Sequence, residues 1–122
     1  MTTTIETQPQ SPKADEKALQ RQFVNFMFFK VDRAFRRENA EVKTQAKREF
    51  AEIIERFTNP MMILPYSNVG LKSTVDFMLW RISFEIEAMQ QMAATINKSI
   101  LGRYLDVPQS YLAMTKHSQY VQ

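Results

Sequence analysis

Few residues in this chain have the chemistry to act as acids, bases, nucleophiles or metal ligands. It has one histidine, His117, and no cysteine among its 122 residues, so neither a two-histidine metal motif nor a thiolate site is possible. A lone histidine near a C-terminus is more often solvated than ligating. Gly70 and Gly102 are the only glycines, so there is no glycine-rich phosphate loop. No serine or threonine has a recognisable base partner in a nucleophile motif. These residues alone indicate no reaction.

One predicted strand carries the remaining candidates, Asp76, Trp80 and Arg81. Asp76 is either a buried carboxylate or, as we favour, a strand-end residue paired with a cation such as Arg81. Trp80 and Arg81 are neighbours in the strand, so their side chains point to opposite faces of the sheet. We interpret Trp80 as an aromatic anchor in a core or an interface. The eight methionines either mark a soft cofactor pocket or fill gaps in the core, and we favour core filling.

The composition argues against several classes of partner. Charged residues make up 24% of the chain and the net charge is only +3. That excess is too small to indicate nucleic-acid binding, and no basic run with interleaved aromatic residues occurs. No stretch approaches the roughly 20 apolar residues of a membrane span. Residues 1–10 lack the apolar segment of a secretory signal, so we expect a cytoplasmic protein without membrane or nucleic-acid partners.

The hydrophobic pattern predicts a flexible leader over residues 1–20 and one domain over residues 21–122, with four strands and two helices. The first helix has an apolar stripe from Val42 to Phe57, and the second has one from Ile86 to Ile100. Ser83 is predicted to cap the second helix, and Gly102 to end it in the left-handed conformation. The predicted order is strand 21–31, helix 39–57, strand 61–66, strand 74–82, the helix between Ser83 and Gly102, and strand 110–115.

This order predicts an α+β fold of ferredoxin-like βαββαβ topology. Right-handed crossovers place both helices on one face of a four-stranded antiparallel sheet. We expect the other face to hold part of the strand 23–31 together with Phe77, Leu79 and Tyr111. A face this apolar implies that a second domain or a second chain covers it.

Several sequence blocks together resemble the chlorite dismutase and coprohaem decarboxylase family. The resemblance extends over residues 23–121 and is carried by an aromatic strand that ends in Lys-Val-Asp and by three further blocks. The four blocks are FMFFKVD at 26–32, DFMLWRI at 76–82, LGRYL at 101–105 and SYLAMTKHSQYV at 110–121.

The resemblance implies that residues 21–122 form the N-terminal half of such a protein. In this family, two ferredoxin-like halves pack their sheets together, and haem or coprohaem binds mainly in the second half on a neutral histidine. Tyr120 and Val121 match the positions of the first half that approach the haem propionates. The family's catalytic and metal-ligating residues belong to the second half, so none is expected in this chain.

The function implied by the resemblance is that of a haem-binding oxidoreductase. Coprohaem decarboxylation in haem biosynthesis is favoured, because it suits the expected cytoplasmic location. Two alternatives stay open. One is a chlorite dismutase, which converts chlorite to chloride and dioxygen. The other is a stand-alone, non-catalytic ferredoxin-like module that forms a homo-oligomer through its open sheet face.

Overall fold

The computed structural model describes residues 21–115, so the leader predicted over residues 1–20 lies outside the described residues. Two long helices and four strands form the fold, with a short helix after β1 and a 3-10 helix before β4. The elements are β1 (Phe23–Val31), α2 (Arg33–Arg36), α3 (Ala40–Phe57), β2 (Met62–Ser67), β3 (Phe77–Ser83), α4 (Ile86–Lys98), η2 (Leu101–Tyr104) and β4 (Leu105–Met114).

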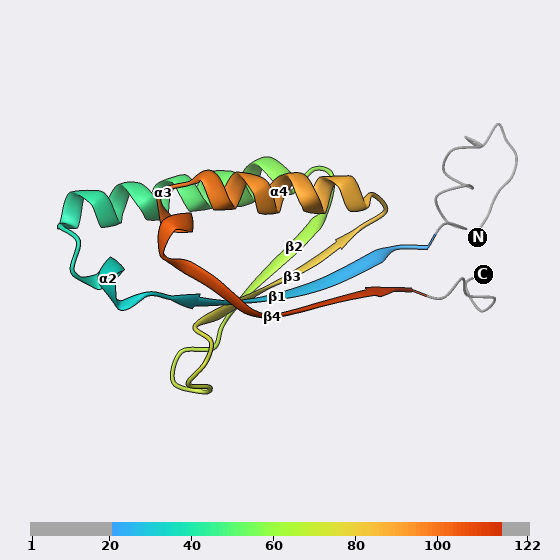
Figure 1. Ribbon diagram of the computed structural model, residues 1–122. Coiled ribbons are helices and arrows are strands. Elements are labelled where there is room, and N and C mark those ends of the chain that lie inside the picture. Colours follow the sequence, from blue (N-terminus) through green and yellow to red (C-terminus); the bar gives the residue numbers. More distant parts are fainter. Residues whose placement is uncertain (1–20, 116–122) are drawn as a thin grey trace, which may run out of the picture.

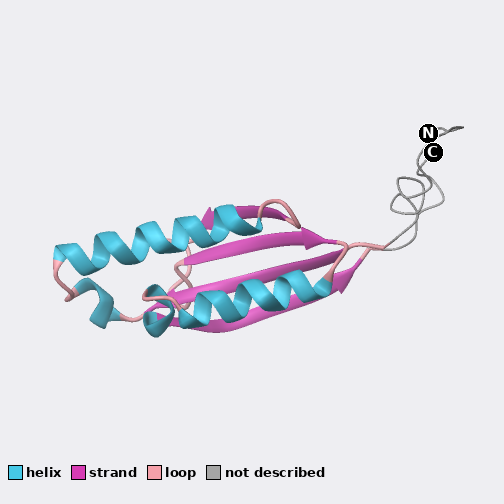
Figure 2. Ribbon diagram, turned by 90° about the horizontal axis from the view of Figure 1, so that it is seen from above, coloured by secondary structure: helices cyan, strands magenta, loops and turns pink. Residues whose placement is uncertain are grey.

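The four strands form one antiparallel sheet in the order β2-β3-β1-β4. Both α3 and α4 lie on the same face of this sheet (Figure 1). Seen from above, both helices lie over the sheet and run roughly along the direction of the strands (Figure 2). The predicted ferredoxin-like α+β fold is confirmed, with aromatic-rich β1 and β3 in the centre.

The main core lies between the sheet and the two helices. The predicted stripe of α3 is buried at Ala46, Ile53 and Phe57, and that of α4 at Met89 and Ile96. Met92, outside the predicted stripe, is also fully buried. Met61 joins Met89 and Met92 in this core, so these methionines fill gaps between helices and sheet, as predicted.

The residues that cap the helices agree only in part with the predictions from the sequence. The side chain of Asn39 caps α3 by accepting a hydrogen bond from the Val42 N–H at 2.8 Å. The prediction for α4 was wrong, because Glu85 occupies the N-cap position without a side-chain bond. Ser83 instead accepts from the Glu85 N–H at 3.0 Å and donates to the Pro60 carbonyl at 3.0 Å. Its hydroxyl therefore ties the β3–α4 turn to the turn between α3 and β2.

The prediction of a left-handed Gly102 was also wrong. Gly102 lies in η2, and among the described glycines only Gly70, with φ of 81°, has a positive φ. A Cβ on Gly102 would lie 2.1 Å from the Ile96 carbonyl oxygen. Glycine is needed there because the chain passes against the end of α4.

Strand β4 begins at Leu105, five residues before the predicted start at 110. It contains Pro108, which has no N–H to donate to a neighbouring strand. The pairing with β1 shifts between Phe28 and Lys30, opposite this proline. A β-bulge in an edge strand accommodates proline, so the strand continues through a segment that reads as a loop.

Candidate functional site

The face of the sheet opposite the helices is rich in aromatic and aliphatic side chains. In the strand register, Phe26 lies opposite both Trp80 and Tyr111, so the even-numbered residues of β1 share a face with them. We call this surface the open face. Its apolar members are Val24, Phe26, Phe28, Met62, Leu64, Tyr66, Met78, Trp80, Ile82, Tyr111 and Ala113.

Aromatic contacts organise the open face. Phe26 stacks on Trp80 with ring centroids 5.5 Å apart, and Tyr66 lies 6.4 Å from Trp80 on the other side. Phe28 meets Tyr111 edge to face at 6.1 Å. Tyr66 and Tyr111 are 45% and 55% exposed. No described helix covers this face (Figure 1), so an apolar surface spans all four strands.

Trp80 and Arg81 face opposite sides, as predicted, with Trp80 on the open face and Arg81 buried beneath the helices. The placement of Phe77 and Leu79 on the open face was wrong. Both pack into the core under α3 and α4, because residues 77, 79, 81 and 83 share one side of β3. The Trp80 indole nitrogen Nε1 is buried without a hydrogen-bond partner among the described residues, a state that costs about 1–3 kcal/mol.

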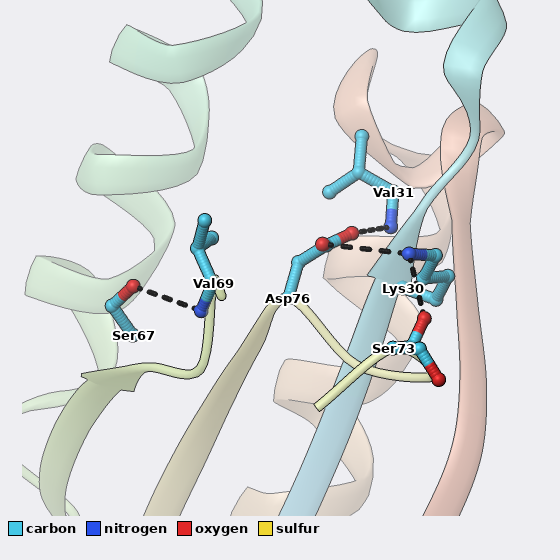
Figure 3. A network of polar contacts seen from close by, with 6 residues as sticks. All are labelled: Lys30, Val31, Ser67, Val69, Ser73 and Asp76. Carbon is cyan, nitrogen blue, oxygen red and sulfur yellow. Dashed lines mark hydrogen bonds and ion pairs between the residues drawn. The ribbon is translucent and has the colours of Figure 1, made fainter. Parts of the chain in front are cut away.

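The β2–β3 loop projects beyond the sheet on the open-face side (Figure 1). Asp76 anchors it, with Oδ2 accepting from the Val31 N–H at 2.7 Å and Oδ1 lying 3.6 Å from the Lys30 ammonium (Figure 3). Lys30 also donates to the Ser73 carbonyl at 3.1 Å. The predicted strand-end pairing of Asp76 is therefore made with Lys30, while Arg81 lies elsewhere.

A polar cavity of about 660 Å³ adjoins this network and includes Arg33 and Arg36 in its lining. Lys30, Asp32 and Asp76 line it too, so the lining combines three cations with two carboxylates, of which Asp76 is paired with Lys30. The loop holds Val69 and Leu71 in solvent, at 69% and 81% exposure. The β2–β3 loop, anchored by Asp76, therefore exposes two aliphatic side chains.

Arg81 is buried on the helix side of the sheet, with 4% exposure. Its Nε and Nη2 donate to the Asn25 side-chain oxygen at 3.0 and 2.7 Å, and Nη1 donates to the Met89 carbonyl at 2.9 Å. Burial lowers the pKa of Arg81 from its usual value to about 10, so the group stays charged at neutral pH. The sequence indicated its face but not its neutral partners, which come from other elements.

The predicted cofactor-binding residues Tyr120 and Val121, and also His117, lie outside the described residues. Strand β4 leads towards them and ends at Met114, after which the Thr115 N–H donates to the Gln22 carbonyl at 2.8 Å. Within residues 21–115, no group of three or more His, Cys, Asp or Glu side chains could hold a metal ion. In the same range, no helix is both long and apolar enough to span a membrane.

A haem group needs an axial ligand, most often an imidazole or a thiolate. Residues 21–115 contain neither histidine nor cysteine. The two commonest axial ligands are therefore absent from the described residues.

Comparison with known proteins agrees with this architecture. The family model for chlorite dismutase matches residues 43–122, whereas no curated protein matches the chain.

Solved structures share the fold. One is chlorite dismutase from Candidatus Nitrospira defluvii in complex with imidazole, at 21% identity and a TM-score of 0.76, covering 88% of this chain and 46% of that one. A mutant of the same enzyme aligns at 20% identity and a TM-score of 0.76, covering 82% and 42%. A haem-binding protein from Thermus thermophilus aligns at 19% identity and a TM-score of 0.67, covering 84% and 47%. The chain thus spans less than half the length of these proteins, and by its family match it belongs to the chlorite dismutase family.

Proposed function

We propose that this chain is one half of a haem-binding oxidoreductase, and that a second ferredoxin-like half covers its open face. The observation that carries the proposal is the aromatic surface centred on Phe26 and Trp80, which lies across the sheet from the helices. Monomeric proteins rarely leave an apolar surface of this extent uncovered.

The comparisons support haem as the cofactor. A structural neighbour of similar fold is described as haem-binding, and the family is named for a haem-dependent activity. As the family resemblance implies, we place the axial ligand in the second half; the described part of this chain contains no histidine.

Tyr120 and Val121 are proposed to contact the haem propionates. A phenol O–H and a backbone N–H are both donors, and hydrogen bonds to a carboxylate are stronger than those between neutral groups. These contacts would orient the porphyrin, while the axial ligand holds the iron.

Within the family, we favour coprohaem decarboxylation in a cytoplasmic haem-biosynthesis pathway. The substrate of a decarboxylation carries more carboxylates than its product. A domain that donates hydrogen bonds to propionate carboxylates is therefore suited to binding such a substrate. Chlorite dismutation is the alternative activity. A non-catalytic homo-oligomer, with the open faces of two copies packed together, is the alternative to any enzyme, and the same apolar face favours it.

Titration of haem into the 122-residue chain, followed by Soret absorption, tests the cofactor role. We expect weak binding or none without an added axial ligand. Free imidazole supplies that ligand, and we then expect saturable binding that is about tenfold weaker in Tyr120→Phe, because a hydrogen bond to a charged group is lost. Tyr111→Phe is the matched control, since it removes a phenol oxygen from the open face.

Two results would contradict the proposal. Equal affinity of the wild type and Tyr120→Phe would remove Tyr120 from the propionate site. A saturable Soret shift without imidazole that disappears in His117→Ala would make His117 an axial ligand, so the iron would not depend on a second half. Comparing haem with coprohaem in the same titration tests the decarboxylase preference, which predicts tighter binding of coprohaem.

A further inference from the structure

On the helix side of the sheet, away from the open face, a cavity of about 310 Å³ lies between α4 and strands β1 and β4. The side chains of Arg81 and Asn25 line it, and Gln90 and Ser110 contribute further polar groups. The remaining lining is apolar and includes Ile86, Ala93 and Leu112. None of the described residues that line it is acidic.

Arg81 brings a positive charge to this cavity without a compensating negative charge. Its three hydrogen bonds go to a neutral amide oxygen and a backbone carbonyl. Among the described residues, the single ion pair joins Lys30 and Asp76. Burial of an unpaired charge is costly, and the lowered pKa of Arg81 reflects that cost.

The guanidinium also has unused donors. It carries five N–H bonds, and three of them are engaged with described residues. The fork of an arginine matches the two oxygens of a carboxylate. The Asn25 oxygen accepts from both Nε and Nη2 and so fixes the orientation of the guanidinium, and the two N–H bonds left for a ligand are one on Nη1 and one on Nη2.

The walls suit an aliphatic chain rather than a second polar group. Ala93 and Ile86 come from α4, and Leu112, which is 57% exposed, comes from the adjacent edge strand. Ligand sites commonly combine apolar walls with a few oriented polar groups. Such a site selects a ligand with one charged end and one apolar end.

We propose that this cavity binds a small aliphatic monocarboxylate, with its carboxylate on Arg81 and its chain against Ile86, Ala93 and Leu112. This site is separate from the open face and independent of the proposed haem function. Its negatively charged ligand supplies the counter-charge that Arg81 lacks within the described domain.

The test is an NMR titration of the isotope-labelled full chain with sodium hexanoate at neutral pH and constant ionic strength. We expect saturable shifts of the Arg81 guanidinium N–H groups together with the backbone amides of Ala93 and Leu112. Hexanol, which has the same chain length without the charge, should bind at least tenfold more weakly. Equal binding of hexanoate and hexanol would overturn the proposal, as would shifts that leave Arg81 unmoved.

Two variants separate binding from folding. Arg81→Gln should weaken hexanoate binding at least tenfold, but it also removes a buried contact to Asn25 and Met89. Ala93→Phe leaves Arg81 in place and fills the cavity, so it should abolish the shifts in a folded protein. Lys30→Gln is the control, because it removes a cation outside the cavity and should leave the affinity unchanged. Retained binding in folded Ala93→Phe would contradict the site.

Discussion

Close backbone approach makes the residue at position 102 unusually sensitive to substitution. In Gly102→Ala, the new Cβ would lie 2.1 Å from the Ile96 oxygen and 3.0 Å from backbone atoms of Asn97. The neighbouring atoms are backbone, so the clash can be relieved only by moving η2 or the end of α4. We expect the free energy of unfolding, measured by urea denaturation, to fall by about 2 kcal/mol or more.

Gly70 provides a matched comparison for that substitution. Nothing lies within 4 Å of a Cβ built there, but its φ is 81°. Gly70→Ala should therefore cost only the left-handed backbone term of about 1–2 kcal/mol, and Gly70→Asn less. If Gly102→Ala unfolded at the same urea concentration as the wild type, the close packing of η2 on α4 would be wrong.

At the residue scale, the sequence predicts which face of the sheet a side chain occupies better than it predicts the hydrogen-bond or ion-pair partners of that side chain. Strand periodicity correctly separates Trp80 from Arg81, because alternation depends on local backbone geometry alone. The partners of Arg81 are Asn25 and Met89, which are distant in the sequence or belong to another element. Asp76 shows the same limit, since its pairing with Lys30 depends on the register of β1 against β3.

At the scale of elements, a hydrogen bond joins η2 to the turn between α2 and α3. The Tyr104 hydroxyl donates to Glu38 Oε2 at 2.6 Å, and its ring lies 5.3 Å from that of Phe35. The bond to Glu38, followed by desolvation, raises the pKa of Tyr104 above its usual value of 10.0. The protonated phenol is favoured in the folded state, so this contribution to stability is complete below pH 10.0 and is lost as pH rises through the raised pKa.

We therefore expect the wild type to contain a tyrosine that ionises at a higher pH than a free phenol, and Tyr104→Phe to lack it. Tyrosinate absorption during an alkaline titration measures it. Glu38→Gln should return that ionisation towards pH 10.0, because both the charge and the strongest acceptor are removed, whereas Tyr66→Phe should leave it unchanged. A late ionisation that persisted in Glu38→Gln would assign the shift to another group.

The elements that the sequence missed are short or are stabilised by other parts of the chain. Helix α2 has only four residues, too few for an apolar periodicity, and Asp32 caps it through a bond to the Ala34 N–H at 2.7 Å. Strand β4 starts early because a bulge against β1 accommodates Pro108. The long helices α3 and α4 were predicted closely, since each buries a continuous stripe.

At the scale of the whole molecule, the two faces of the sheet have different roles. The helix face is complete within the described chain, with Phe29 and Leu79 at 1% and 0% exposure. The open face keeps Tyr66 and Tyr111 about half exposed. Topology determines this asymmetry, because both crossover helices fall on one side. The sequence predicted an uncovered apolar face for this reason, although it misplaced Phe77 and Leu79.

Two neighbouring residues of β4 allow the role of the open face to be tested. Tyr111 lies on the open face at 55% exposure, and Leu112 lies on the helix face at 57% exposure. Without a second half, the open face of the isolated chain should be covered by another copy, so light scattering after size exclusion at micromolar concentration should show a dimer or a larger assembly.

Tyr111→Lys places a positive charge in that contact. Either the charge is buried, which is costly, or the contact breaks. We expect it to shift the chain towards monomer, whereas Leu112→Lys, with nearly equal exposure, should leave the assembly intact. A wild-type monomer, or equal effects of the two substitutions, would show that the open face is not the contact surface.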